Sequence, residues 1–231
     1  MHRQRASRLT RTLLSAAVAV PVLLAAGCSS DDSGGSDEDA KAKPSSKPSA
    51  SLEPARFKKL PPVCESLTKG TVKDVVPGVD KAKGKNLGPK DGDSYGSCIW
   101  TGLKEYDYRS LTLSMRRFDS HATLGSADAR AKKFLSQQVA ATRSDKSNDG
   151  LDEKPLKGVG DEATSLEYKT KEKYGKSKEE HRLNKLVVRS ANTVLTVDYG
   201  GAGFEDGKLP KAEDLRKGAE KAAKEALSSL G

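Results

Sequence analysis

The clearest pattern in the chain is an alternation of apolar and polar residues between Arg109 and Phe118. Leu111, Leu113 and Met115 alternate there with serine, threonine and arginine. Successive side chains of a β-strand point to opposite faces, so the segment is predicted to be a half-buried strand. Weaker versions of the pattern predict four further strands at residues 97–102, 162–171, 180–190 and 193–199, the last two joined by a tight turn at Ala191-Asn192.

Apolar residues at helical spacing mark three other segments. Residues 64–76 predict one or two short helical turns that end at Pro77-Gly78. Ser126 is a suitable N-cap for a helix whose Ala131, Leu135 and Val139 share a face with Phe134. A final helix is predicted from near Pro210 to about Leu227. Residues 79–95 and 141–157 are polar and are expected to be loops.

These elements predict an α+β fold with the order α-β-β-α-β-β-β-α. Strands in runs, joined by short loops, favour an antiparallel pairing. We therefore expect an antiparallel β-sheet of about five strands, packed by helices on one face. The predicted domain, residues 57–231, is long enough to form one sizeable core.

The first 28 residues follow a different pattern. Four arginines precede an apolar stretch from Leu13 to Ala26, as in a secretory signal peptide, and the stretch ends in Leu24-Ala25-Ala26-Gly27-Cys28. Small residues before a cysteine resemble the lipobox of bacterial lipoproteins, so we expect cleavage after residue 27 and a diacylglycerol on Cys28. About 14 apolar residues fall short of the roughly 20 that a membrane-spanning helix needs, which disfavours the alternative of an uncleaved anchor.

Residues 28–56 are rich in Ser, Gly, Asp, Lys, Pro and Ala and contain almost no large apolar side chains. Such a segment cannot bury enough surface to fold and is predicted to be a disordered tether. A coil of about 27 residues spans roughly 30 Å on average. The protein is therefore expected to be anchored to the cell membrane by its lipid, with its domain on the extracytoplasmic face.

The charge balance restricts the partners. The chain carries +9, the signal peptide removes four positive charges, and the tether carries −2, which leaves about +7 on residues 57–231. Export argues against nucleic acid as the partner of this basic domain. Anionic lipid headgroups and acidic wall polymers are the available counter-charges. The alternative is a solvated lysine-rich surface that keeps the domain soluble.

With Cys28 lipidated, Cys64 and Cys98 remain as a pair. An even pair of cysteines in an exported protein predicts a disulfide, here closing a loop of about 34 residues. The alternatives are a metal ligand or a catalytic thiol, and neither cysteine has a histidine near it in the sequence.

A second candidate site is a basic hairpin with Tyr174-Gly175 at its tip. Alternation would place its lysines on one face, interrupted by Glu172, Glu179 and Glu180. These lysines could contact an anionic lipid or a wall polymer; the alternative is a solvated hairpin whose charge prevents edge pairing. The lysines are Lys169, Lys171, Lys173, Lys176 and Lys178.

Motifs for catalysis or cofactor binding are weak. The glycines of Gly158-x-Gly160-x-x-Ala163 precede a predicted strand, not the helix that a dinucleotide fingerprint requires. Asp91-Gly92-Asp93-Ser94 lacks the further ligands of a calcium loop. The histidines, His2, His121 and His181, have no cysteine partners for a metal site, and no Gly-x-Ser-x-Gly elbow is present. We predict no catalytic residue, metal or cofactor.

Four features occur in a recognisable order along the chain. They are the lipobox and tether at Cys28, Pro62-Val63-Cys64-Glu65-Ser66-Leu67, Cys98-Ile99-Trp100 and Gly158-Val159-Gly160-Asp161-Glu162-Ala163. This order resembles a family of small actinobacterial lipoproteins catalogued only as domain of unknown function 3558, over about residues 57–230. The resemblance to this family implies a disulfide-bonded α+β domain with no established activity. A more distant likeness is to extracellular sensor domains of some actinobacterial receptor kinases.

The sequence thus predicts a non-catalytic envelope lipoprotein that binds a protein or another ligand outside the membrane. One alternative is a carrier or sensor of a small apolar molecule, which would need a cavity between sheet and helices. Another is an envelope enzyme, which would need clustered acids or a nucleophile in a cleft.

Overall fold

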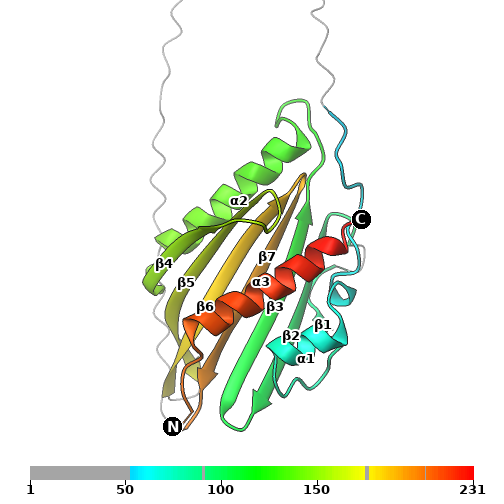
Figure 1. Ribbon diagram of the computed structural model, residues 1–231. Coiled ribbons are helices and arrows are strands. Elements are labelled where there is room, and N and C mark those ends of the chain that lie inside the picture. The colour runs from blue at the N-terminus through cyan, green and yellow to red at the C-terminus, as the bar shows by residue number, and fades with distance from the viewer. Residues whose placement is uncertain (1–52, 90–91, 175–176, 206) are drawn as a thin grey trace, which may run out of the picture. The chain divides into compact units, whose positions relative to one another are not determined.

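The computed structural model describes residues 53–89, 92–174, 177–205 and 207–231, all within the second of two compact units, residues 49–231. Its centre is one antiparallel sheet with the strand order β1-β2-β3-β7-β6-β5-β4 (Figure 1). The strands are β1 (Lys85–Asn86), β2 (Tyr95–Lys104), β3 (Asp107–Arg117), β4 (Asp149–Leu156), β5 (Glu162–Tyr174), β6 (Ser177–Ser190) and β7 (Thr193–Gly203).

The α+β class and the antiparallel sheet are confirmed, but the sheet has seven strands, not about five. The two additional strands are β1 and β4, in segments predicted to be loops. Both lie at the edges of the sheet and are largely exposed, so neither shows an apolar alternation. β4 also contains Pro155 and several charged residues, which natural sheets place at edges to prevent further pairing.

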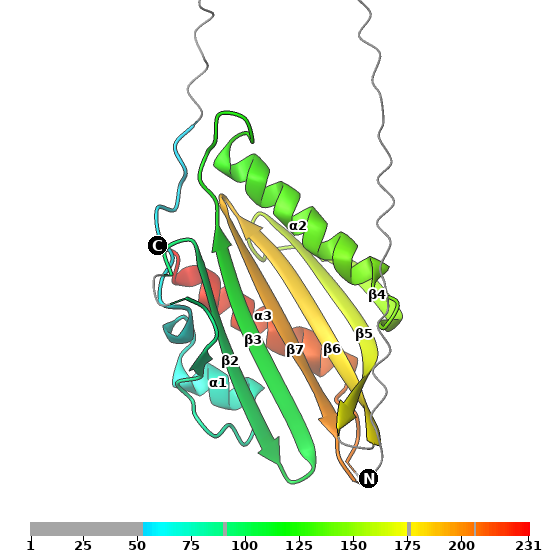
Figure 2. The same ribbon diagram turned by 180° about the vertical axis from the view of Figure 1, so that it is seen from behind.

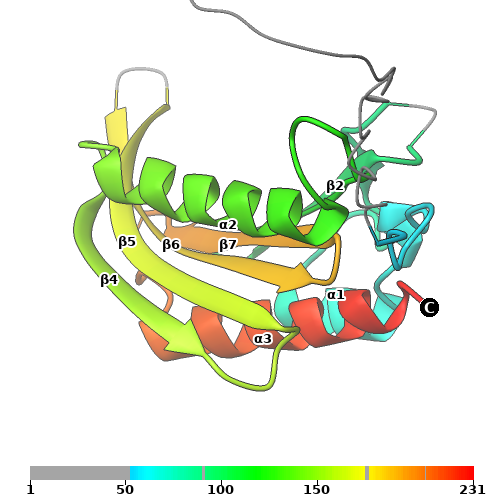
Figure 3. The ribbon, with the colours of Figure 1, turned by 90° about the horizontal axis from the view of Figure 1, so that it is seen from above.

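The prediction that helices cover one face is wrong, because they cover both. The helical elements are the 3₁₀ turn η1 (Val63–Glu65), α1 (Lys69–Val75), α2 (Ala127–Ser144) and α3 (Ala212–Ser228). Figure 2 shows α2 in front of the sheet with α3 behind it, and Figure 3 shows the two helices on opposite sides.

Both faces of the central strands are apolar, which explains this arrangement. Leu186 and Val188 belong to the larger core beneath α3, whereas the residue between them, Val187, packs with α2. A strand covered on both faces loses its alternation and becomes a continuous apolar run. The runs Leu186–Val188 and Val194-Leu195 carry that signal in the sequence.

The larger core lies between the sheet and the elements on its α3 side, which include η1 and α1 (Figure 1). Trp100, Leu111, Leu113 and Met115 fill it with at most 1% of their surface exposed. α3 contributes small residues, which let the helix approach the sheet closely: Ala219, Ala222, Ala223 and Ala226. Leu215 of this helix is also buried, and Leu227 is partly buried against the same core.

Local predictions of caps and turns are also confirmed. The Ser126 side chain accepts a hydrogen bond from the Ala129 N–H at the start of α2. Ser190 pairs with Thr193, so Ala191 and Asn192 form the two-residue turn between β6 and β7.

Candidate functional site

The predicted disulfide is present. Cys64 in η1 is bonded to Cys98 in β2, with 5.2 Å between their Cα atoms. Cys98 is fully buried in the larger core. Because both sulfur atoms are in the bond, neither serves as a metal ligand or a thiol nucleophile in this structure.

Several predicted features lie outside the described residues. They include the signal peptide, Cys28 with its lipid, most of the tether, Lys176, His2 and Asp91. Lipidation of Cys28 therefore stays a prediction. In the part of the chain that the structure describes, no helix is long and apolar enough to cross a membrane.

The described residues also contain no group of three or more His, Cys, Asp or Glu side chains that could hold a metal ion. His121 is exposed, and His181 is buried with its ring 6.1 Å from that of Tyr108. Gly158 and Gly160 have positive φ in the connection that leads into β5, not into a helix. This connection therefore lacks the helix N-terminus to which a pyrophosphate would bind.

The predicted lysines lie on a hairpin that projects beyond the sheet. β4 pairs with β5 only as far as Lys169, and β7 pairs with β6 only from Arg182, so the rest of the hairpin pairs only with itself. Lys169, Lys171 and Lys173 alternate along β5, and Lys173 lies opposite Lys178 in β6. We call Lys169, Lys171 and Lys178 the lysine face.

The glutamates of the hairpin divide between its two sides. Glu172 and Glu179 are opposite each other on the side away from the lysine face. Glu180 is on the lysine face, with its carboxylate 3.1 Å from the Lys169 Nζ. Lys171 and Lys178 are exposed, whereas Lys169 is partly buried.

The structure places a further lysine, Lys146, beside the lysine face. The turn after α2 brings this exposed residue to the base of the hairpin, where it lines a hollow of about 420 Å³ together with Lys169 and Lys171. The Asp145 carboxylate holds the turn by accepting hydrogen bonds from the Ser147 N–H and hydroxyl, which lower the pKa of Asp145. No local pattern could have placed Lys146 beside residues more than twenty positions away.

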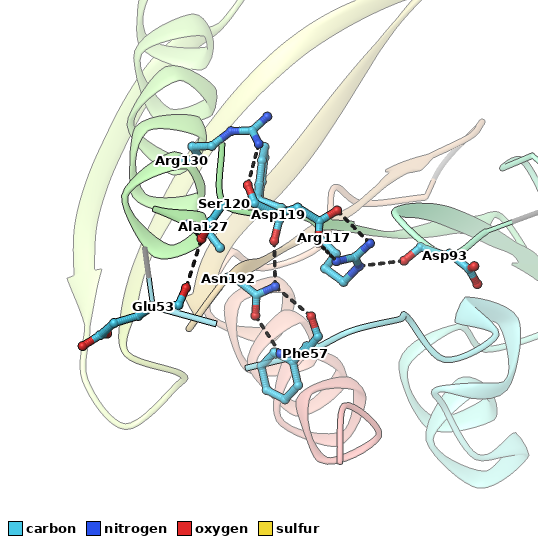
Figure 4. Close-up of polar contacts among 10 residues, drawn as sticks. Glu53, Phe57, Asp93, Arg117, Asp119, Ser120, Ala127, Arg130 and Asn192 are labelled. Atoms are coloured by element: carbon cyan, nitrogen blue, oxygen red, sulfur yellow. Dashed lines mark hydrogen bonds and ion pairs between the residues drawn. The ribbon is translucent and has the colours of Figure 1, made fainter. Parts of the chain in front are cut away.

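The tether joins the domain at the opposite end of the sheet. Asn192, fully buried in the β6–β7 turn, donates hydrogen bonds from Nδ2 to the carbonyls of Phe57 and Phe118, and its Oδ1 accepts from the Phe57 N–H. Ser120 donates to the Glu53 carbonyl nearby. Figure 4 shows these contacts converging where the first described residues meet β3 and α2.

A third feature is the part of the sheet that α2 leaves uncovered. α2 packs over β5, β6 and one half of β7. On the same side of the sheet, no helix covers β2, β3 and the other half of β7 (Figure 2). Hydroxyl side chains dominate this area, which we call the hydroxyl face: Thr101, Ser110, Thr112 and Ser114 are partly exposed, and Ser97 and Thr196 are buried. The Ser97 and Ser114 hydroxyls are 2.9 Å apart.

Two hollows, of about 320 and 190 Å³, follow the hydroxyl face and meet at Asp198. The Asp198 carboxylate is 3.2 Å from the Lys185 Nζ, with 34% and 19% of the two side chains exposed. Burial, and next the nearby charge of Asp198, raise the pKa of Tyr168 to about 12. The sequence does contain a signal of this site: Lys185 and Asp198 are charged residues within the otherwise apolar parts of β6 and β7.

Comparison with protein-family models finds no match to this chain, and comparison with curated proteins finds no similar sequence. The resemblance to the lipoprotein family of unknown function therefore rests on the motifs quoted above. What the domain binds must be inferred from its own surfaces.

Proposed function

We propose that this protein is a lipid-anchored, non-catalytic binding protein of the cell envelope, attached to the membrane through Cys28. The lipobox-like sequence and the Ser/Gly-rich segment after it support the anchor. The Cys64–Cys98 disulfide supports an oxidising, extracytoplasmic compartment. The resemblance to the actinobacterial lipoproteins of domain of unknown function 3558 belongs to the same proposal.

The observation that carries the binding role is the separation of the lysine face from the tether. Lys178 lies near one end of β6, whereas Asn192, which holds Phe57, follows the other end. Twelve residues of strand separate Lys178 from Ser190, a distance of about 40 Å.

This separation favours a polymer over the lipid surface as the partner. A coil made from residues 28–52 would span about 25–30 Å on average, less than the distance from the tether exit to the lysine face. To reach the membrane, the lysine face would need a tether stretched back along the domain. We therefore propose that it binds an acidic polymer of the envelope beyond the headgroups.

The other candidate functions receive less support from the described residues. The space between α3 and the sheet, where a small apolar ligand would bind, is filled by Trp100, Leu111 and their neighbours. The glutamates of the hairpin are divided between its two sides, and Glu180 is paired with Lys169. These glutamates therefore do not form the cluster of acids that an enzyme site would need.

The test is binding of the mature chain to polyphosphate and to vesicles with 30% anionic lipid, at low and physiological salt. Lys171→Gln with Lys178→Gln should weaken polyphosphate binding at least fivefold. The matched control, Lys58→Gln with Lys59→Gln, removes the same charge from exposed positions at the tether end and should have little effect. Equal losses in both variants would show that only net charge matters, and preferential binding to vesicles would contradict the polymer.

The anchor needs a separate test in cells. Cys28→Ser should move the protein from the membrane fraction to the medium or the soluble envelope fraction. The diacylglycerol is expected to be joined to the chain through the Cys28 sulfur, so the loss of that sulfur removes both acyl chains that anchor the protein stably. Retention of Cys28→Ser in the membrane after a high-salt wash would contradict lipidation as the anchor.

A further inference from the structure

The hydroxyl face has the features of a ligand site that is distinct from the lysine face. We propose that its two hollows together bind an uncharged, hydroxyl-rich chain such as a neutral glycan. The proposal goes beyond the function proposed above and does not depend on it, because it concerns different residues on a different part of the sheet.

The charges that line the two hollows balance, which favours an uncharged ligand. Their lining contains two cations, Arg116 and Lys185, and two anions, Asp198 and Glu172. Lys185 is paired with Asp198, and the Arg116 guanidinium lies 5.0 Å from the ring centre of Tyr95 and 5.1 Å from that of Phe134. A site with no net charge offers a charged ligand little attraction.

The polar lining argues against an apolar ligand. A fatty chain laid over Thr112 and Ser114 would remove water from their hydroxyls without replacing its hydrogen bonds. It would also dehydrate the Lys185–Asp198 pair, and burying polar groups without partners costs free energy. Hydroxyl groups of a ligand can both donate to and accept from serine and threonine, so they replace that water.

The backbone excludes strand addition by a peptide. β3 is paired along its length with β2 and β7, and β7 is paired with β3 and β6. A peptide that adds to a sheet needs the free backbone groups of an edge strand. The hydroxyl face therefore offers a ligand side chains alone.

The shape of the site favours a chain over a single small molecule. Arg116 and Tyr108 line opposite ends of the two hollows and are eight residues apart on β3, about 26 Å. Tyr95 and Tyr108 supply an aromatic ring at each end, each with an apolar body and a polar hydroxyl. Sugar rings have C–H faces that contact aromatic rings and hydroxyls that hydrogen-bond.

The probe is a series of neutral chito-oligosaccharides of two to six rings, titrated into the mature chain and followed by amide NMR. The expected result is a set of shifts confined to the elements that line the two hollows, which are β2, β3, β5, β6, β7 and α2, with affinity that rises with chain length and then levels off. Thr112→Val keeps the shape of the side chain, removes one hydroxyl, and should weaken binding about fivefold, as expected for one hydrogen bond.

Two comparisons make the test decisive. The Lys171→Gln, Lys178→Gln variant should bind the hexamer with unchanged affinity, and loss of binding there would place the ligand on the lysine face instead. Tighter binding of decanoate than of the hexamer, or no shift on β3 and β7 at millimolar hexamer, would overturn the proposal. An unchanged affinity in Thr112→Val, with the fold intact by NMR, would overturn it as well.

Discussion

Asn192 holds Phe57, 135 residues earlier in the chain, through two hydrogen bonds of 2.9 Å each. The amide thus forms a closed pair with the N–H and the carbonyl of one residue, as a neighbouring strand would. A third hydrogen bond, to the Phe118 carbonyl, ties the same side chain to the link between β3 and α2. Phe57, which follows the tether, is therefore fixed to the turn between β6 and β7, two strands in the middle of the strand order.

Replacing Asn192 with alanine should destabilise the domain by about 2–4 kcal/mol, because three hydrogen bonds are lost and buried backbone groups are left without partners. Urea denaturation checks the free energy of unfolding, and hydrogen exchange checks the Phe57 amide. Asn192→Asp keeps an acceptor for the Phe57 N–H but loses both donors, so it should also be destabilising. A wild-type exchange rate at Phe57 in Asn192→Ala would contradict the role of this side chain.

Loss of the disulfide should be comparably severe. Cys64 and Cys98 close a loop of 34 residues, and the chain-entropy model assigns such a cross-link roughly 3–4 kcal/mol. The measurement is urea denaturation of Cys64→Ala with Cys98→Ala in a Cys28→Ser background, compared with that background oxidised and reduced. Equal stability of the oxidised and reduced background would show that the bond contributes little.

Secondary structure was predictable from the sequence where one face of a strand or helix is buried and the other is exposed to solvent. Leu111, Leu113 and Met115 alternate with polar residues, and they were placed correctly on the core side of β3. β1 and β4 were missed because an exposed edge strand has no buried face and hence no period. The second helical layer was not predicted, although Val187 between Leu186 and Val188 makes the short apolar run of a strand covered on both faces. Such a short run does not show by itself which helix covers the second face.

The candidate sites were predictable only within one hairpin. The lysines of β5 and β6 are close in sequence, so alternation alone brings them together. Lys146, Asn192 and the Lys185–Asp198 pair act across elements, and the strand order that joins them is set by the packing of the whole core. Single-sequence patterns carry little information about such long-range neighbours.

Gly218 shows packing overriding helix propensity. It lies within α3, where alanine is normally better by about 1 kcal/mol. A Cβ at this position would lie 2.5 Å from Cε1 of Tyr199, whose ring is held by a hydrogen bond from its hydroxyl to the Val75 carbonyl. Gly218→Ala should therefore lower the free energy of unfolding by about 1–3 kcal/mol.

The matched control is Gly70→Ala, an exposed position within α1 where a new Cβ would meet only the Thr68 hydroxyl, at 3.8 Å. This variant should be neutral or stabilised by up to about 1 kcal/mol. Denaturation curves of both variants measure the difference. A stabilised Gly218→Ala would show that α3 can move away from Tyr199 at no cost.

Tyr168 should make the domain sensitive to alkaline pH. Its pKa is raised from the ordinary value of 10 to about 12, chiefly by burial and next by the charge of Asp198. Because the folded state holds the phenol proton more tightly than the unfolded state, the stabilising contribution is complete below pH 10. It is lost as the pH rises from about 10 to 12. Tyr168→Phe has no phenol proton to lose, so its stability should fall less over this range.

Burial raises the pKa of Tyr168 more than the charge of Asp198 does, and Asp145 contributes less again. This order can be tested by removing each charge in turn. Asp198→Asn removes the negative charge but leaves Tyr168 buried, so the pKa of Tyr168 should fall only part of the way back to 10. Asp145→Asn removes a weaker contribution and should lower the pKa less. The absorbance of phenolate at 295 nm, taken as the difference between each protein and its Tyr168→Phe counterpart, isolates this group from Tyr199, whose pKa burial also raises. A full return to 10 in Asp198→Asn would mean that charge, not burial, controls the proton of Tyr168.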